Sequence, residues 1–135
     1  MLNTCAQKFV NFLQEKKLHF DINSSESEKS VVSFPYDGKT ARVFFSGEDG
    51  TYMSMYLVFE SVPEEKTIDL LVLCNELNNT YKWVKFYLDN DNDLLLQDDA
   101  ILNVSTAADE AFELMIRMFN ISKDIKSQVM KAIYA

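Results

Sequence analysis

The sequence has little of what most catalytic and nucleotide-binding sites are built from. Its 135 residues include three glycines, two cysteines and one histidine, His19. The glycines all fall in predicted turns between strands, which excludes a phosphate-binding loop, and no Gly-x-Ser-x-Gly nucleophile elbow occurs. Cys5 and Cys74 lack Cys-x-x-Cys spacing, so a transition-metal site built on His or Cys has too few ligands. We therefore predict no catalytic residues, no cofactor, no metal centre and no enzymatic activity.

Positive charge is also scarce. Lysine and arginine total 13 against 21 aspartates and glutamates, a net charge of −8, and Arg42 and Arg117 are the only arginines. Phosphate backbones are bound through cationic contacts that release counterions, so nucleic acid is excluded as a partner, and anionic membranes are disfavoured for the same reason. The acidity favours solubility or attraction to basic partners.

Long apolar runs are missing as well. The longest extends from Leu70 to Cys74, far short of the ~20 residues needed to span a bilayer. The first residues include no basic segment followed by an apolar one, which a secretory signal requires. We expect a cytoplasmic protein whose two cysteines are reduced and pack as small core residues.

The 47% apolar and 13% aromatic content is that of a globular chain, and the length suits one domain, residues 1–135. Helical spacing of apolar residues alternates with period-two segments, and Asp37-Gly38 is a strong hairpin turn. Together they predict an α+β domain with an antiparallel sheet and the order α-β-β-β-α-β-β-α. The expected elements are a helix at 3–17, a short strand at 18–23, a loop at 24–29, strands at 30–36, 40–46 and 51–61, a helix at 62–79, strands at 82–89 and 93–97, and a helix at 105–133. We expect a kink or break in this last helix near residues 120–122.

Alternation along the strands predicts a sheet with two different faces. Met53, Met55 and Leu57 point to one face, because neighbouring side chains in a strand alternate. The other face receives aromatic residues with polar groups, a type enriched at protein interfaces. We predict that it forms a homodimer or partner contact, and the alternative is that another part of the chain covers it. The predicted contact residues are Phe44, Tyr52, Tyr56, Trp83 and Tyr87.

The acidic segment 89–93 (DNDND) matches a calcium-binding loop only in part. An EF-hand loop needs Gly at its sixth position and Glu at its twelfth, which here are Leu94 and Ala100. The flanking segments are strands, so we interpret the segment as a hairpin turn, with weak Ca²⁺ binding by the 89–99 region as the alternative. Asp98 and Asp99 could serve as paired carboxylates, and a hydrolase that uses the acids of 89–99 with a divalent metal is a further alternative, but the sequence suggests no base, acid or pocket for one.

The stretch from Val62 to about Leu102 resembles the YbjN family of small bacterial proteins, which are named as putative sensory transduction regulators. The family pattern is Val-Pro-acid-acid-basic, a helix that ends in Leu-Asn, a strand with Phe, an acidic turn and a second strand. The matching residues are Val62, Pro63, Glu64, Glu65, Lys66, Leu77, Asn78, Phe86, Asp89 and Leu94. The chain departs where the family places glycine, since it has Val84-Lys85 and Asn92.

The resemblance implies a fold similar to that of type III secretion chaperones and a regulatory role, with no catalytic residues to carry over. Together with the composition, it favours a non-enzymatic, chaperone-like or regulatory protein-interaction module that forms a homodimer. A small-ligand sensor with a pocket between sheet and helices is the alternative function.

Overall fold

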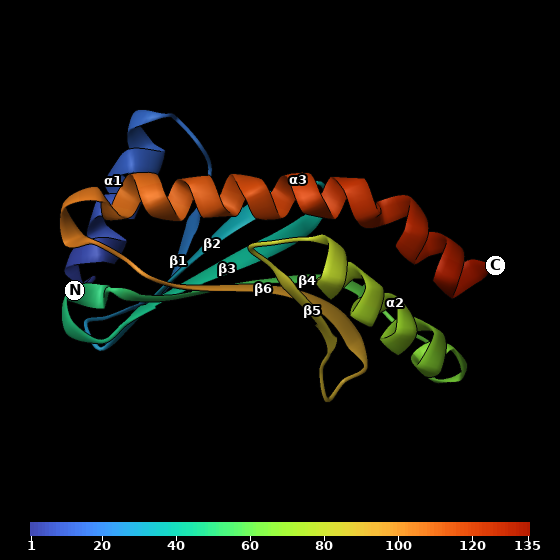
Figure 1. Ribbon diagram of the computed structural model, residues 1–135. Helices are drawn as coiled ribbons and strands as arrows, with labels where there is room; N and C mark the ends of the chain where they lie inside the picture. The colour runs from blue at the N-terminus through green and yellow to red at the C-terminus, as the bar shows by residue number, and fades with distance from the viewer.

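The structure, a computed structural model that describes residues 1–135, is built on one six-stranded antiparallel sheet. The strands lie in the order β1-β2-β3-β4-β6-β5, and three α-helices accompany them (Figure 1). The elements are α1 (Thr4–Glu15), β1 (Asp21–Glu26), β2 (Lys29–Tyr36), β3 (Lys39–Ser46), β4 (Tyr52–Ser61), α2 (Thr67–Thr80), β5 (Lys85–Leu88), β6 (Asp93–Ile101) and α3 (Ala107–Tyr134). The predicted α+β class and antiparallel sheet are confirmed, with one strand more before α2 than in the predicted order α-β-β-β-α-β-β-α.

The additional strand is β1, at the edge of the sheet. It begins within the short strand expected at 18–23 and continues through Ser24–Glu26, which the sequence predicts to be a loop. Ser24 and Ser25 pair with Val31 and Ser30 of β2. An edge strand is held by backbone hydrogen bonds and can be polar on both faces, which removes the alternation that would have revealed it.

The turns follow the sequence signals. Asp37 and Gly38 join β2 to β3 with φ of 51° and 75°. Positive φ at both central positions is the geometry that matches the twist of a two-residue hairpin, and glycine adopts it without strain. These turns set the register in which Val32, Val43 and Met55 lie side by side on one face.

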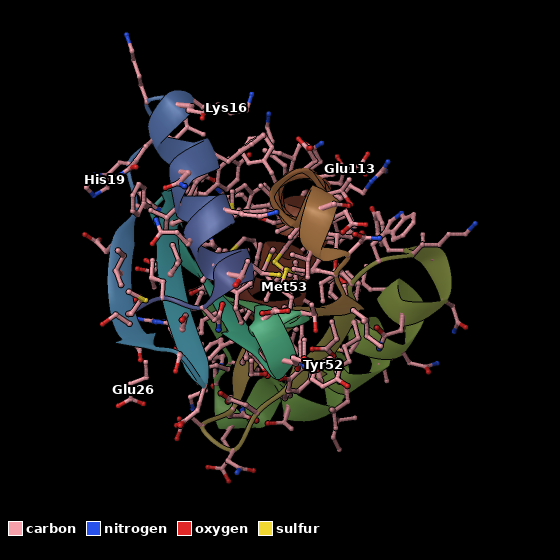
Figure 2. All side chains as sticks on the ribbon, turned by 90° about the vertical axis from the view of Figure 1, so that its left-hand side faces the viewer. Lys16, His19, Glu26, Tyr52, Met53 and Glu113 are labelled. Carbon is pink, nitrogen blue, oxygen red and sulfur yellow. The ribbon has the colours of Figure 1, made fainter.

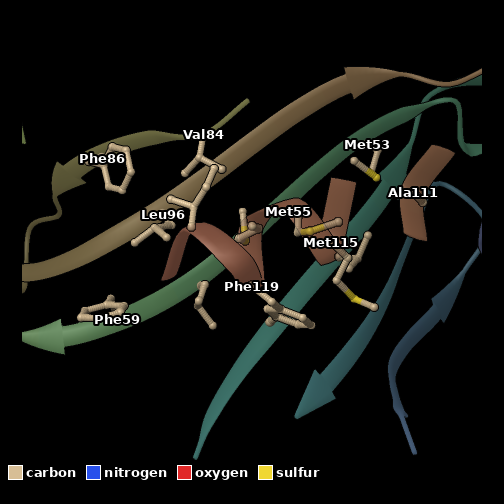
Figure 3. Packing of buried hydrophobic residues seen from close by; sticks show 14 of the residues in the cluster. Met53, Met55, Phe59, Val84, Phe86, Leu96, Ala111, Met115 and Phe119 are labelled. Carbon is tan, nitrogen blue, oxygen red and sulfur yellow. The ribbon is translucent and has the colours of Figure 1, made fainter. Parts of the chain in front are cut away.

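The helices cover that face. In Figure 1, α1 and α3 lie on one side of the sheet, and α2 lies beside β5 and the second half of α3. Met55 and Leu96 of the sheet face Met115 and Phe119 of α3 in one apolar cluster (Figure 3). The ring of Phe119 stacks on Tyr36 of β2, with centroids 4.1 Å apart. This packing is the main core of the protein.

Of the kink or break predicted near residues 120–122, the break is wrong, because α3 is continuous from Ala107 to Tyr134. The apolar residues seemed to change phase near position 120. Met118 and Ser122 lie between the apolar residues of the first half of the helix and those of the second half, and both are buried. Ser122 is small enough to be buried there, and as a polar residue it hid the regular spacing of the stripe. None of the three helices combines the length and apolarity needed to cross a membrane.

Candidate interaction surface

The candidate functional surface is the face of the sheet that points away from the helices, which we call the outer face. Alternation along β4 separates the two sides: Met53 is 1% exposed, whereas its neighbour Tyr52 is 57% exposed. Figure 2 shows Met53 near the centre of the molecule and Tyr52 further out. The strand register brings Arg42, Tyr56 and Gln97 into one row across this face. The sequence therefore places aromatic and polar side chains together on a surface that no helix covers.

Aromatic side chains form the middle of the outer face. The rings of Phe44 on β3 and Tyr56 on β4 meet edge to face, with centroids 5.4 Å apart, and the ammonium of Lys29 lies 5.8 Å from the Phe44 centroid. Edge-to-face pairs fix the orientation of both rings. The ring surfaces of Phe44 and Tyr56 are only half-buried, so apolar area stays open to solvent.

A chain of hydrogen bonds continues the surface across β5 and β6. The hydroxyl of Tyr87 donates to Oε1 of Gln97 at 2.6 Å, and Nε2 of Gln97 donates to the Asp99 carboxylate at 3.0 and 3.1 Å. Partial burial, followed by the nearby Tyr56, Asp89 and Asp99, raises the pKa of Tyr87. Tyr87 is thus a neutral donor whose position is fixed by its bond to Gln97.

The charge of this surface differs from that of the whole chain. The strand register places three cations, Lys29, Arg42 and Lys85, and three carboxylates, Asp21, Glu26 and Asp99, on this face of the sheet. The chain as a whole has a net charge of −8. The outer face is therefore close to neutral, and acidic groups are concentrated elsewhere.

The prediction that Trp83 shares this face is wrong. The strand expected at 82–89 begins only at Lys85, so alternation does not extend back to Trp83. Trp83 has a φ of 78°, which turns the chain toward α3, and the Arg117 guanidinium lies 5.2 Å from the centroid of its ring. Four of the five predicted contact residues, Phe44, Tyr52, Tyr56 and Tyr87, remain together on the outer face.

The cavity next to Trp83 is a shallow groove. It has a volume of about 240 Å³, is open to solvent, and is lined by residues of the α2–β5 connection and α3, including Tyr81 and Asn120. A sensor pocket between sheet and helices was the alternative expectation. That space holds the buried cluster that contains Met55 and Met115 instead.

The acidic segment forms the turn between β5 and β6. Carboxylate oxygens of Asp89, Asp91 and Asp93 all lie within 4.8 Å of one another. Oδ1 of Asp89 accepts from the backbone N–H groups of Asp91 and Asp93 at 3.0 and 2.9 Å, and Oδ1 of Asp93 accepts from the Ser61 hydroxyl at 2.9 Å. The Asp89 carboxylate therefore holds the turn itself, and the Asp93 carboxylate ties it to the end of β4.

The sequence profile of a family described as "putative bacterial sensory transduction regulator" matches residues 9–124. The chain belongs to this family, YbjN. No curated protein matches the chain. The family description fits the regulatory role that the resemblance implies.

The YbjN motif residues have a structural role here. At the end of α2 the side chain of Asn78 donates to the carbonyl of Phe86 at 3.0 Å and accepts from its N–H at 2.8 Å. Asn78 thus pairs with the free edge of β5 as a neighbouring strand would. Asn92, which stands where the family places glycine, adds a second link: its amide donates to the carbonyl of the motif residue Val62 at 2.9 Å and to the Thr67 hydroxyl at 3.0 Å. Asn78 and Asn92 together hold α2 against the β5–β6 hairpin.

Sequence reasoning missed one buried group. Asp98 of β6 is 6% exposed, and its Oδ2 has no hydrogen-bond partner. Burial first, and the neighbouring Asp99 second, raise its pKa to about 7. Because Leu94 and Leu96 point inward, period-two alternation puts Asp98 inward as well. Alternation along β6 therefore indicates that Asp98 is buried, but the sequence predicts a strand that ends at residue 97 and does not include it.

Proposed function

We propose that this YbjN protein is a cytoplasmic regulatory module that acts by binding proteins rather than by catalysis, and that the outer face forms a homodimer. The proposal rests on the uncovered aromatic surface around Phe44 and Tyr56. Monomeric soluble proteins rarely leave a large contiguous apolar patch in water. Tyr52 is 57% and Ile101 is 79% exposed, and the two lie directly opposite each other on β4 and β6. A partner that covers them would remove this apolar area from water.

Charge supports a second copy of the chain as that partner. Two chains of net charge −8 repel each other most where their acidic groups meet. The near-neutral outer face is where two copies approach with little repulsion. It also carries both signs, so a twofold axis can bring Asp99 of one copy toward Arg42 or Lys85 of the other. Isologous contacts of this kind are the commonest way in which soluble chains pair.

The dimer is tested by glutamates at the exposed edge of the outer face. The double variant Tyr52→Glu/Ile101→Glu is expected to be monomeric in sedimentation velocity, with a dimer dissociation constant raised at least ~100-fold, because each copy would bury two uncompensated carboxylates. The wild-type chain is expected to sediment as a dimer under the same conditions.

Two control variants change exposed apolar residues away from the outer face. Trp83→Ser and Ile116→Glu are expected to remain dimeric, since Trp83 contacts Arg117 and Ile116 lies on α3. A wild-type chain that stays monomeric at ~100 µM would rule out the proposal. So would a dimer that survives the Tyr52 and Ile101 changes but dissociates in a control variant.

A further inference from the structure

Helix α2 has apolar residues on two opposite sides. Its buried side consists of Leu70, Leu73, Cys74 and Leu77. At about 100° per residue, the opposite side consists of Ile68, Leu71 and Val72. These three side chains are 74%, 50% and 56% exposed, and we call them the α2 stripe.

The exposure of the α2 stripe is not what the helix composition leads one to expect. An apolar side of a helix normally packs against another element. Here α2 packs mainly on β5 and α3, and in Figure 1 it lies at the edge of the molecule. Single exposed apolar residues are common, but three on adjacent turns of one helix face form a continuous patch. The stripe therefore has the character of an interaction surface.

The surroundings of the stripe are acidic. Asp69 and Glu76 are two turns apart on the flank next to Val72, and both are exposed. Glu64 and Glu65 precede the helix and are exposed too. The one cation in residues 64–80 is Lys66, whose ammonium donates to the backbone carbonyl of Ala135 at 3.0 Å. The surface thus combines an apolar centre with negative charge along its side.

We propose that the α2 stripe binds a basic amphipathic helix of another protein. Such a helix presents apolar residues at i, i+3, i+4 and i+7, which pack against Ile68, Leu71 and Val72, while its lysines or arginines meet Asp69 and Glu76. A second copy of α2 would instead bring two acidic flanks together. An anionic membrane is repelled by the same carboxylates. The proposal concerns a surface separate from the outer face and does not depend on the dimer.

The test uses a fluorescein-labelled 18-residue peptide of leucine and lysine, with the leucines at the spacing of an amphipathic helix. Fluorescence anisotropy is expected to show binding to the wild-type chain. The variant Ile68→Gln/Val72→Gln is expected to bind at least ~10-fold more weakly. Since both side chains are exposed, it is expected to fold normally, which circular dichroism checks. Asp69→Asn/Glu76→Gln is expected to weaken binding and to reduce its dependence on salt.

Matched controls separate this proposal from the dimer. A leucine–glutamate peptide with the same apolar spacing is expected to bind at least ~10-fold more weakly than the lysine peptide. The Tyr52→Glu/Ile101→Glu variant is expected to keep the lysine peptide's affinity. Unchanged affinity in Ile68→Gln/Val72→Gln, or equal affinity for both peptides, would overturn the proposal. If Ile68→Gln/Val72→Gln dissociates the dimer in sedimentation, the stripe is occupied by a second copy, and both proposals fail.

Discussion

Replacing Asp98 with asparagine is expected to stabilise the protein by about 2 kcal/mol at pH 8 and to change its stability little at pH 4. In the folded chain the pKa of Asp98 is raised from its usual 3.8 to about 7. A shift of one pKa unit corresponds to ~1.4 kcal/mol, so the ionised group costs up to ~4 kcal/mol in the folded state. Asparagine removes the charge but leaves a buried amide, which offsets part of the gain.

The pH dependence follows from which state loses its proton first. Below pH 4 Asp98 is protonated in both the folded and the unfolded chain. Between pH 4 and about 7 the unfolded chain ionises while the folded chain holds the proton, so the free energy of unfolding falls as pH rises. Above about pH 7 both states are ionised and the loss is complete. This Asp98 contribution to stability is therefore present in acid and absent at neutral to alkaline pH.

Urea unfolding of the wild type and of Asp98→Asn at pH 4, 6 and 8 measures the difference directly. The matched control is Asp91→Asn, which removes one negative charge from an exposed turn position. It is expected to change stability by less than ~0.5 kcal/mol at each pH. A destabilisation by Asp98→Asn that is equal at pH 4 and pH 8 would show that Asp98 is not a raised-pKa group in the fold.

The second large effect is expected at Asn3: replacing it with alanine is expected to lower the free energy of unfolding by about 2–4 kcal/mol. The Asn3 side chain, 7% exposed in all, caps α1 by accepting from the Ala6 N–H at 3.1 Å. Its amide nitrogen donates to the carbonyls of Ser27 and Phe45 at 3.1 and 2.7 Å. Loss of an N-cap costs about 1 kcal/mol, and loss of the two bonds that the buried Asn3 amide donates costs about 0.5–1.5 kcal/mol each.

Thermal and urea unfolding of Asn3→Ala test this value against Asn11→Ala, which changes an exposed asparagine of the same helix. Asn11 accepts only from the Gln7 side chain, so its replacement is expected to cost less than ~0.5 kcal/mol. Gly50→Ala is a second variant that disturbs the same contacts, because the added methyl group would collide with the Asn3 side-chain amide. If Asn3→Ala and Gly50→Ala each cost less than ~1 kcal/mol, Asn3 does not bridge these segments.

Much of the sheet could be predicted because its signals are local. The Asp37-Gly38 turn requires positive φ at two adjacent residues, and this sets the β2–β3 register without reference to the rest of the chain. Alternation along β4 then places Met53 and Tyr52 on opposite faces of the sheet. The same reasoning placed Phe44, Tyr56 and Tyr87 on the second face, as the structure has them.

Predictions failed where distant contacts decide the local structure. β1 is held by pairing with β2 and has no apolar pattern of its own. Trp83 lies just before β5 and is turned toward α3, where it meets Arg117. The continuity of α3 depends on Ser122 being small enough to be buried, which its residue type does not indicate.

The sequence by itself determined the α+β class, the hairpins and the two-sided character of the sheet, because strand alternation and turn geometry are properties of neighbouring residues. Tertiary structure alone decided which surfaces meet water. Ile68, Leu71 and Val72 look like core residues in the sequence, yet α2 has only one side to pack on β5 and α3. Burial of any side chain depends on segments far away in the chain. The spacing of apolar residues does not indicate how many sides of a helix will pack against other elements.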